Sequence, residues 1–406
     1  MKKVLFMFLV FSVFIGSISV SAGILTRTKL RLLEKSADIY TILDENYNDN
    51  ANAPEDFIKV KALSELAVNY LYSGTHETTF SMLKNAETIC DSMQNDYYKA
   101  YGYAKIACAY AEFKNMLGIR EKSKAAADKG IAVVAKLYNS HEKVRMYNGF
   151  IRILMNIRYY KQVNELIAIN LIELENISDV YYKSLCALDL AAFVSIMKDN
   201  ETLVNNLFDI SYNETQNMND AFNKSIILCE IADYSFIRNN NEIAGNFIDQ
   251  AINAANNTED SYYKHKAFSK IAKVLLVNGN FQKANSIISN ECKQALNNTS
   301  DNYYKALELV ETAGIYYVIG NKEKAYEYLL ECEQNISQIE DFQLKVLVNN
   351  KLFWVYYIFE DNNKAIEINN NSYKYAQNLN TITIIANNYA ILRDFDKANE
   401  ILLNIK

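Results

Sequence analysis

Apolar stretches recur along the chain at a nearly constant distance, and most of them open with an aspartate and a lysine. The aspartate stands three or four positions before the lysine, and an apolar run continues beyond it. The lysine occurs as Lys59, Lys99, Lys143, Lys183, Lys224, Lys264, Lys305 and Lys345, so that the spacing is 40, 41 or 44 residues. A constant period of this length indicates an array of stacked supersecondary units.

Each unit is expected to contain a first helix, a turn and a second helix. An aspartate before an apolar run is a good N-cap, and the lysine one turn later can pair with it for about a few tenths of a kcal/mol. A small residue follows the lysine by eight positions in six units, and in the last four units an alanine stands twelve positions further on. Gly279-Asn280 and Gly320-Asn321 lie between these positions, where one helix stops and the chain reverses. The pattern predicts one helical hairpin per unit.

The two ends of the array carry amphipathic segments. Thr28 to Asn46 reads as a single helix before the first unit, and we expect residues 23–55 to form an N-terminal cap. A ninth unit lacks the lysine and closes with a helix over Asp394 to Lys406, which puts Ala398 and Ile401 on one face. Its polar residues are expected to face water: Asp396, Asn399, Glu400 and Asn404.

Composition agrees with an all-helical chain. The 406 residues include one proline and 11 glycines, so few residues would break a helix. The formal charge of -6 speaks against nucleic acid as a general partner, since phosphate binding needs a basic face.

Residues 1–22 have the pattern of a secretory signal. Lys2 and Lys3 precede an apolar stretch from Val4 to Gly16, and small residues follow before Gly23. We therefore expect an exported protein of the periplasm, cell envelope or medium, without stable membrane insertion after cleavage. The alternative is an uncleaved N-terminal membrane anchor.

Neither cysteine nor histidine forms a repeated motif. The six cysteines share no common register, and two interpretations stay open: a disulfide between Cys292 and Cys332, or free thiols used as small apolar residues. His76, His141 and His265 lie on different units and are interpreted as surface residues. No glycine-rich phosphate loop or nucleophile elbow occurs, so we expect no metal, no cofactor and no catalysis.

The small and large apolar positions resemble the tetratricopeptide repeat (TPR) family. Two units match its spacing well, through Ala272, Leu275, Gly279, Ala284 and Ile288, and through Ala313, Tyr316, Gly320, Ala325 and Leu329. The resemblance covers about residues 56–406, although the period is 40 rather than the family's 34 and the closing proline is missing. It implies an all-α, right-handed solenoid of about nine helix-turn-helix repeats with terminal capping helices, wound as an open spiral.

The same resemblance implies a binding surface on the first helix of each unit. The family's groove positions fall on Arg145, Asn148, Arg152 and Asn156 in the third unit, and on Lys266 and Lys273 in the sixth. These side chains could hold a carboxylate by charge-assisted hydrogen bonds. In the eighth unit they fall on Trp354 and Tyr357, which suit an apolar contact. The alternative interpretation is a solvated helix face, or packing between units.

We therefore expect a non-catalytic scaffold or adaptor that binds a protein or peptide with an acidic or apolar segment. One alternative is an enzyme on a closed α/α toroid, which would need acidic residues converging on a central cavity. No such set recurs in the inner positions, where Glu112 and Asp233 stand alone. Another alternative is a structural array that binds copies of itself.

Overall fold

The computed structural model describes residues 53–403, apart from 114, 117, 196 and 198–199. The predicted signal at 1–22 lies outside the described residues, as does the predicted N-terminal cap except for its last three residues.

The predicted all-α solenoid is confirmed, and the described residues form nine helical hairpins and no strand. The first helices of the hairpins are α5 (Glu55–Ser73), α7 (Asp96–Ala111), α9 (Ser140–Asn156), α11 (Val180–Ser195), α13 (Ala221–Ile237), α15 (Ser261–Val277), α18 (Asn302–Ile319), α20 (Phe342–Ile358) and α22 (Leu379–Ile391). The second helices are α6 (His76–Ser92), α8 (Ile119–Val134), α10 (Tyr160–Glu175), α12 (Glu201–Gln216), α14 (Asn241–Asn256), α19 (Lys322–Ser337), α21 (Asn362–Tyr373) and α23 (Phe395–Leu403). In the sixth hairpin the second helix is divided into α16 (Phe281–Ile287), the π-helical η1 (Ile288–Cys292) and α17 (Lys293–Asn298).

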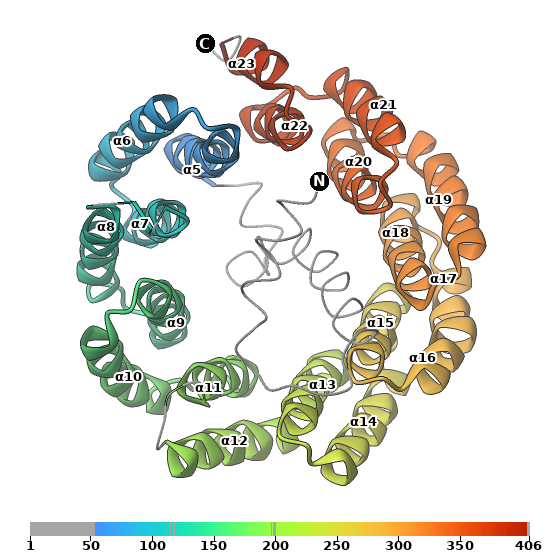
Figure 1. Cartoon of the computed structure of the whole chain (residues 1–406). Helices are drawn as coiled ribbons and strands as arrows, with labels where there is room; N and C mark the ends of the chain where they lie inside the picture. The colour runs from blue at the N-terminus through green and yellow to red at the C-terminus, as the bar shows by residue number, and fades with distance from the viewer. Residues whose placement is uncertain (1–52, 114, 117, 196, 198–199, 404–406) are drawn as a thin grey trace.

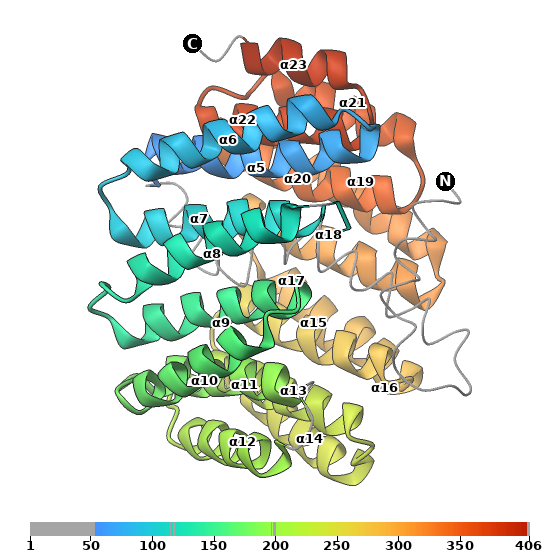
Figure 2. The same ribbon diagram turned by 60° about the vertical axis from the view of Figure 1, so that its left-hand side comes forward.

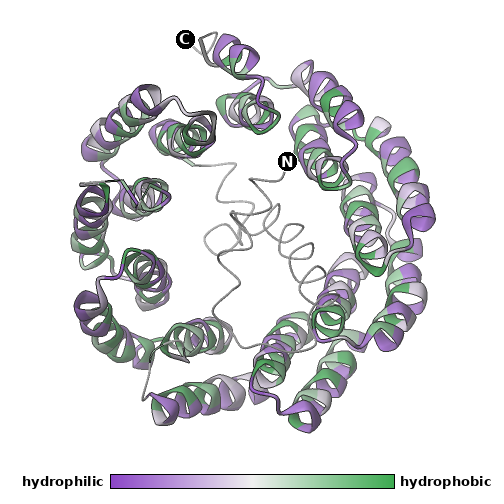
Figure 3. Ribbon diagram, in the orientation of Figure 1, coloured by the Kyte–Doolittle hydropathy of each residue, from purple (hydrophilic) through white to green (hydrophobic). Residues whose placement is uncertain are grey.

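The hairpins form two concentric layers, with the first helices inside and the second helices outside (Figure 1). Hydrophobic residues gather where the layers meet, and hydrophilic residues dominate the outward side of the outer helices (Figure 3). The small residues that recur eight and twenty positions after the lysine are all buried where the two helices of a hairpin cross, among them Ala107, Ala191, Ala272 and Ala313 at 0% exposure. Because alanine has no atoms beyond Cβ, the two backbones of a hairpin can approach closely at these points.

The array closes on itself, and the expected open spiral is wrong. Helix α5 packs against α22, and the first hairpin lies beside the last in both views (Figures 1 and 2). The side-chain amide of Asn69 donates to Asn387 Oδ1, and the Tyr70 hydroxyl donates to Asn399 Oδ1 and to the carbonyl of Phe395. Asn399 was expected to face water, but it bonds across this junction.

A buried apolar cluster accompanies these hydrogen bonds. It contains residues of α5, α20, α22 and α23: Leu66, Tyr70, Val346, Ile385, Ala386, Tyr389, Ala390, Ala398 and Ile401. Helix α5 therefore packs against α22 as successive inner helices pack against each other, and Tyr70 joins it to α23. The first hairpin thus packs on the ninth at the place where a tenth hairpin would pack in a longer array.

The aspartates four positions before the lysine act as predicted, but Asp56 and Asp96 lie inside the first turns of α5 and α7, and the repeated lysine does not act as predicted. Asp220, Asp260, Asp301 and Asp341 are N-caps whose side chains accept backbone amides at the start of an inner helix. The lysine does not pair with them. Most of these lysines reach the outer layer instead, where the ammonium group meets either a carboxylate or the last carbonyls of the preceding outer helix, whereas Lys59 lies 2.6 Å from Glu55 of its own helix.

Both kinds of lysine contact are well defined. Lys143 Nζ lies 2.9 Å from Glu173 Oε1, and Lys183 Nζ lies 3.1 Å from Glu214 Oε1. Lys99 Nζ donates to the carbonyls of Asp91 and Met93, at 2.8 and 3.1 Å. The last carbonyls of a helix have no intrahelical partner and carry its negative dipole end, so a cation there ties one hairpin to the next.

All six cysteines are free thiols, so the predicted alternative of a disulfide between Cys292 and Cys332 is not realised. Cys332 donates to the carbonyl of Ala306 at 3.4 Å and is buried, as Cys292 is.

Candidate functional site

The inner helices line a cavity of about 2180 Å³. Its walls come from α5, α9, α11, α13, α15, α18, α20 and α22. Because the inner helices pack side by side and each begins its unit, the same repeat positions of successive units face the cavity at the same level.

One such position carries charge in seven of the nine units. It is the sixth residue after the repeated lysine, and its occupants are Glu65, Lys105, Asp189, Glu230, Lys270, Glu311 and Lys351. All but Lys105 line the cavity. We call this set the charged belt. The expectation that no acidic set recurs on the inner helices is therefore wrong. The signal was present in the sequence and required only that the units be compared at this position.

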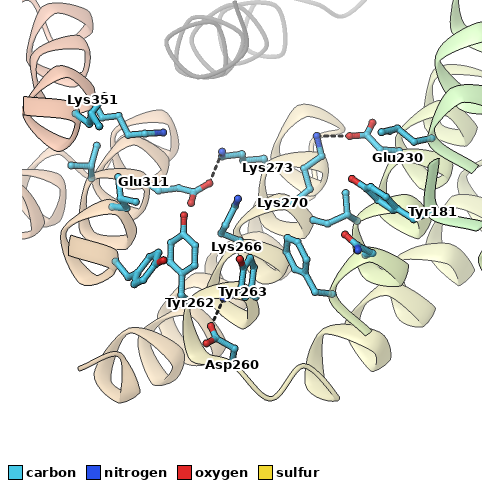
Figure 4. Close-up of a pocket in the computed structure, with 18 of the residues that line it drawn as sticks. Tyr181, Glu230, Asp260, Tyr262, Tyr263, Lys266, Lys270, Lys273, Glu311 and Lys351 are labelled. Atoms are coloured by element: carbon cyan, nitrogen blue, oxygen red, sulfur yellow. Dashed lines mark hydrogen bonds and ion pairs between the residues drawn. The ribbon is translucent and has the colours of Figure 1, made fainter. Parts of the chain in front are cut away.

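Members of the charged belt form ion pairs between neighbouring inner helices. Lys270 Nζ lies 2.6 Å from Glu230 Oε1, and Lys105 Nζ lies 3.7 Å from Glu65 Oε1. Lys273, three residues further along α15, lies 2.7 Å from Glu311 Oε1 (Figure 4). Burial alone would raise the pKa of Glu311, but the ammonium group of Lys273 lowers that pKa to about 2. The carboxylate is thus held in its charged form.

Aromatic residues line part of one end of the cavity, at the starts of α11, α13, α15 and α18. They are Tyr181, Tyr182, Phe222, Tyr262, Tyr263, Tyr303 and Tyr304, and we call them the aromatic collar. Rings from neighbouring units touch, with centroids 4.5 Å apart for Tyr262 and Tyr304 and 5.0 Å apart for Phe222 and Tyr263. The collar therefore helps to join the hairpins and also forms cavity wall (Figure 4).

The predicted binding residues are only partly brought together. Arg145, Lys266 and Lys273 line the cavity. Asn148 does not: it is 1% exposed and accepts from Asn170 Nδ2 at 2.8 Å. Its repeat position lies at the contact with the outer layer, because Ser64 and Ser269 are buried there as well.

The other predicted binding residues are not part of the cavity wall that the described residues form. Arg152 is exposed and Asn156 is half-buried on α9. Trp354 and Tyr357 are half-buried on α20, where their rings pack edge to face with centroids 5.9 Å apart.

The prediction that all three histidines lie at the surface is wrong for His265. This side chain is 0% exposed on α15, where its Nε2 lies 2.9 Å from Thr312 Oγ1 on α18. His141 is half-buried and stacks on Tyr182, with centroids 4.2 Å apart, while His76 is exposed. Burial lowers the pKa of His265 to about 4, so the imidazole is neutral inside the wall.

We expect His265 to make the fold sensitive to mild acid. Below its ordinary pKa of 6.5 the unfolded chain takes up a proton at this histidine, whereas the folded chain does so only near pH 4. The free energy of unfolding should therefore fall by about 1 kcal/mol between pH 7 and pH 5.5 on account of this residue. Chemical denaturation at the two pH values measures the difference. It should shrink in His265→Gln and persist in the exposed control His76→Gln. An unchanged difference in His265→Gln would assign the acid sensitivity to other groups.

Within the described residues, no group of three histidine, cysteine or acidic side chains is placed to hold a metal ion. No described helix combines the length and apolar character needed to cross a bilayer.

Comparison with known proteins identifies no family. No protein-family model matches the chain, and no curated protein matches it. Among solved structures, Ton1535 from Thermococcus onnurineus NA1 is 14% identical, with a TM-score of 0.31 over 80% of this chain and 99% of its own. Rap protein complexed with competence and sporulation factor is 11% identical, with a TM-score of 0.33 over 76% and 97%. NprR in complex with its cognate peptide NprX is 14% identical, with a TM-score of 0.30 over 86% and 97%. At these scores the likenesses do not bear on what this chain binds.

Proposed function

We propose that this chain is a non-catalytic binding protein that holds a peptide, or an extended segment of another protein, in the cavity of its ring. The observation that carries the proposal is the cavity of about 2180 Å³. Pockets that bind small molecules usually measure about 300–1,000 Å³. A longer, chain-like ligand would fill more of this volume than a small molecule would.

The chemistry of the wall favours binding over catalysis. An acid catalyst needs a pKa near the working pH, whereas Glu311 is held charged by its ion pair with Lys273. Burial raises the pKa of one nearby carboxyl group, Glu308, to about 8. That side chain is 0% exposed, accepts from Thr299 Oγ1 at 3.0 Å and does not line the cavity. It therefore could not meet a substrate there.

Of the residues predicted for binding, we propose Arg145, Lys266 and Lys273 as contacts, since they line the cavity. The proposal that the protein is exported depends on the pattern of residues 1–22 alone.

Filling the cavity tests the proposal. Ala192 on α11 and Ala221 on α13 both line it, and the double variant Ala192→Trp with Ala221→Trp adds two large rings to the open space. The matched control is Ala125→Trp with Ala168→Trp, which places the same rings on exposed positions of the outer helices α8 and α10.

The measurement begins with a random peptide display library selected on the wild-type protein. The affinity of each enriched peptide is then measured for both double variants. We expect the cavity variant to lose about tenfold or more in affinity, or about 1.4 kcal/mol, while the control keeps the wild-type value. The proposal is wrong if no peptide is enriched, or if the enriched peptides bind the cavity variant as tightly as the control.

A further inference from the structure

We infer that the segment bound in this cavity carries lysine or arginine side chains between apolar ones. The inference rests on the proposed function and names the chemistry of the ligand. Three features of the described cavity wall support it: its charge balance, the carboxylates at its aromatic end, and the way that end already holds an ammonium group.

The cavity wall is acidic. Eleven aspartate and glutamate side chains line it, against six lysine and arginine side chains. The whole chain has a formal charge of -6, so the excess of five acidic groups on one concave surface is most of that charge. A cavity with walls of low dielectric concentrates such a field and raises the local concentration of cations.

Much of this negative charge lies among the rings of the aromatic collar. Five exposed carboxylates lie there, at the starts of α11, α13, α15 and α18: Asp179, Asp220, Glu259, Asp260 and Asp301. The four helix N-termini contribute about half a positive charge each, so roughly two of the five negative charges are offset. An excess of negative charge remains at this end.

The collar already holds one cation. Lys266 Nζ lies 5.8 Å from the ring centroid of Phe222 and 5.6 Å from that of Tyr262. Both distances are within reach of a cation–π interaction, which is worth about 0.5–2 kcal/mol. The other rings of the collar offer the same surface beside carboxylates, an arrangement that suits a lysine or arginine side chain of a ligand.

The charge distribution argues against the acidic segment that the sequence predicted. Two of the lysines that would attract it, Lys270 and Lys273, are already in ion pairs with Glu230 and Glu311. To use these two lysines, an acidic ligand would have to break both pairs, and it would also approach the carboxylates of the collar.

Three synthetic peptides test the ligand chemistry. Each is fluorescein-labelled, is about twelve residues long and alternates leucine with lysine, glutamine or glutamate. Fluorescence polarisation at about 50 mM salt should show the lysine peptide binding about tenfold or more tightly than the glutamine peptide, with the glutamate peptide weakest. The preference should shrink at about 500 mM salt, where charges are screened beyond a few ångströms.

The outcomes separate this inference from the proposed function. If the glutamine or glutamate peptide binds as tightly as the lysine peptide, and the cavity-filling double variant abolishes that binding, the inference is wrong and the proposed function stands. If every peptide binds the cavity-filling double variant as tightly as it binds the wild-type protein, both the inference and the proposed function are wrong.

Matched variants locate the effect. Asp220→Asn, Asp260→Asn and Asp301→Asn together remove three charges from the collar but keep the N-caps, because asparagine caps helices equally well and does so here at Asn95, Asn139 and Asn378. The control removes three charges outside the cavity wall, through Glu323→Gln, Glu327→Gln and Asp341→Asn. Asp341 is an N-cap of the same kind.

We expect the collar variant to bind the lysine peptide about fivefold or more weakly, and the control to stay within about twofold of wild type. Equal melting temperatures of the two variants would show that capping is intact. Equal affinities would overturn the inference, because the loss would then reflect the net charge of the molecule and not the collar.

Discussion

Replacing Tyr70 with alanine is expected to open the ring between its first and last hairpins. The tyrosine is 3% exposed, its ring packs on Phe395 with centroids 4.8 Å apart, and its hydroxyl donates to Asn399. Removing a buried aromatic side chain costs about 3–5 kcal/mol, and here the loss falls on the one junction that no peptide bond holds together. The array should therefore open there before any hairpin unfolds. Hydrogen exchange should speed up in α5 and α22, and small-angle scattering should show a larger radius of gyration.

Tyr110 provides the matched control. It stands at the same repeat position on α7, is also 3% exposed, and lies inside the array. Tyr110→Ala should lower the melting temperature by a similar amount without enlarging the particle, because the neighbouring hairpins remain covalently connected. If Tyr70→Ala keeps the wild-type radius of gyration, the junction is stronger than its contacts indicate. If Tyr110→Ala expands equally, the effect is not particular to the junction.

Adding one methyl group at Gly130 is expected to destabilise the protein by about 2–3 kcal/mol. A Cβ atom there would lie 2.2 Å from Phe150 Cζ and 3.0 Å from Tyr103 Cβ. Phe150 is 0% exposed, so its ring can move away only by displacing other atoms of the close-packed core. The clash outweighs the gain of about 1 kcal/mol in helix propensity that alanine brings over glycine. Denaturant titration of Gly130→Ala measures the net effect.

Gly245 shows what the same substitution does without a clash. It lies in α14 and a Cβ there would meet no atom within 4 Å, so Gly245→Ala should leave stability unchanged or raise it by up to about 1 kcal/mol. Combining Gly130→Ala with Phe150→Leu should recover part of the loss. A purely additive result in this double-mutant cycle would contradict steric conflict between the two positions.

Much of the architecture could be predicted because it repeats. The aspartate caps, the apolar run and the paired alanines are local signals, and each recurs often enough to define the hairpin and its length. Closure of the ring could not be predicted in this way. It depends on the small rotation between successive hairpins summed over nine units, and no residue encodes that sum. Asn69, Tyr70 and Asn387 show their role only once both ends are placed in space.

The site was predicted less well, for a different reason. The groove positions came from a family with a shorter unit, and in this longer hairpin one of them, Asn148, turns toward the outer helix. The charged belt was visible in the chain as a repeat position that alternates acidic and basic residues, such as Glu230, Lys270 and Glu311. The ion pairs of this position form because neighbouring inner helices place those residues side by side. An alignment of the units predicts this placement. The groove positions taken from the shorter repeat do not include it.

The junction between the first and last hairpins has a consequence for how the chain can be ordered. Since α5 packs against α22 as any inner helix packs against the preceding inner one, the starting point of the polypeptide is arbitrary with respect to the packing of the inner layer. A circular permutant that begins at the turn between α12 and α13, and connects α23 to α5 through a flexible linker, would retain every hairpin interface. It would only move the single non-covalent junction to another point on the circumference.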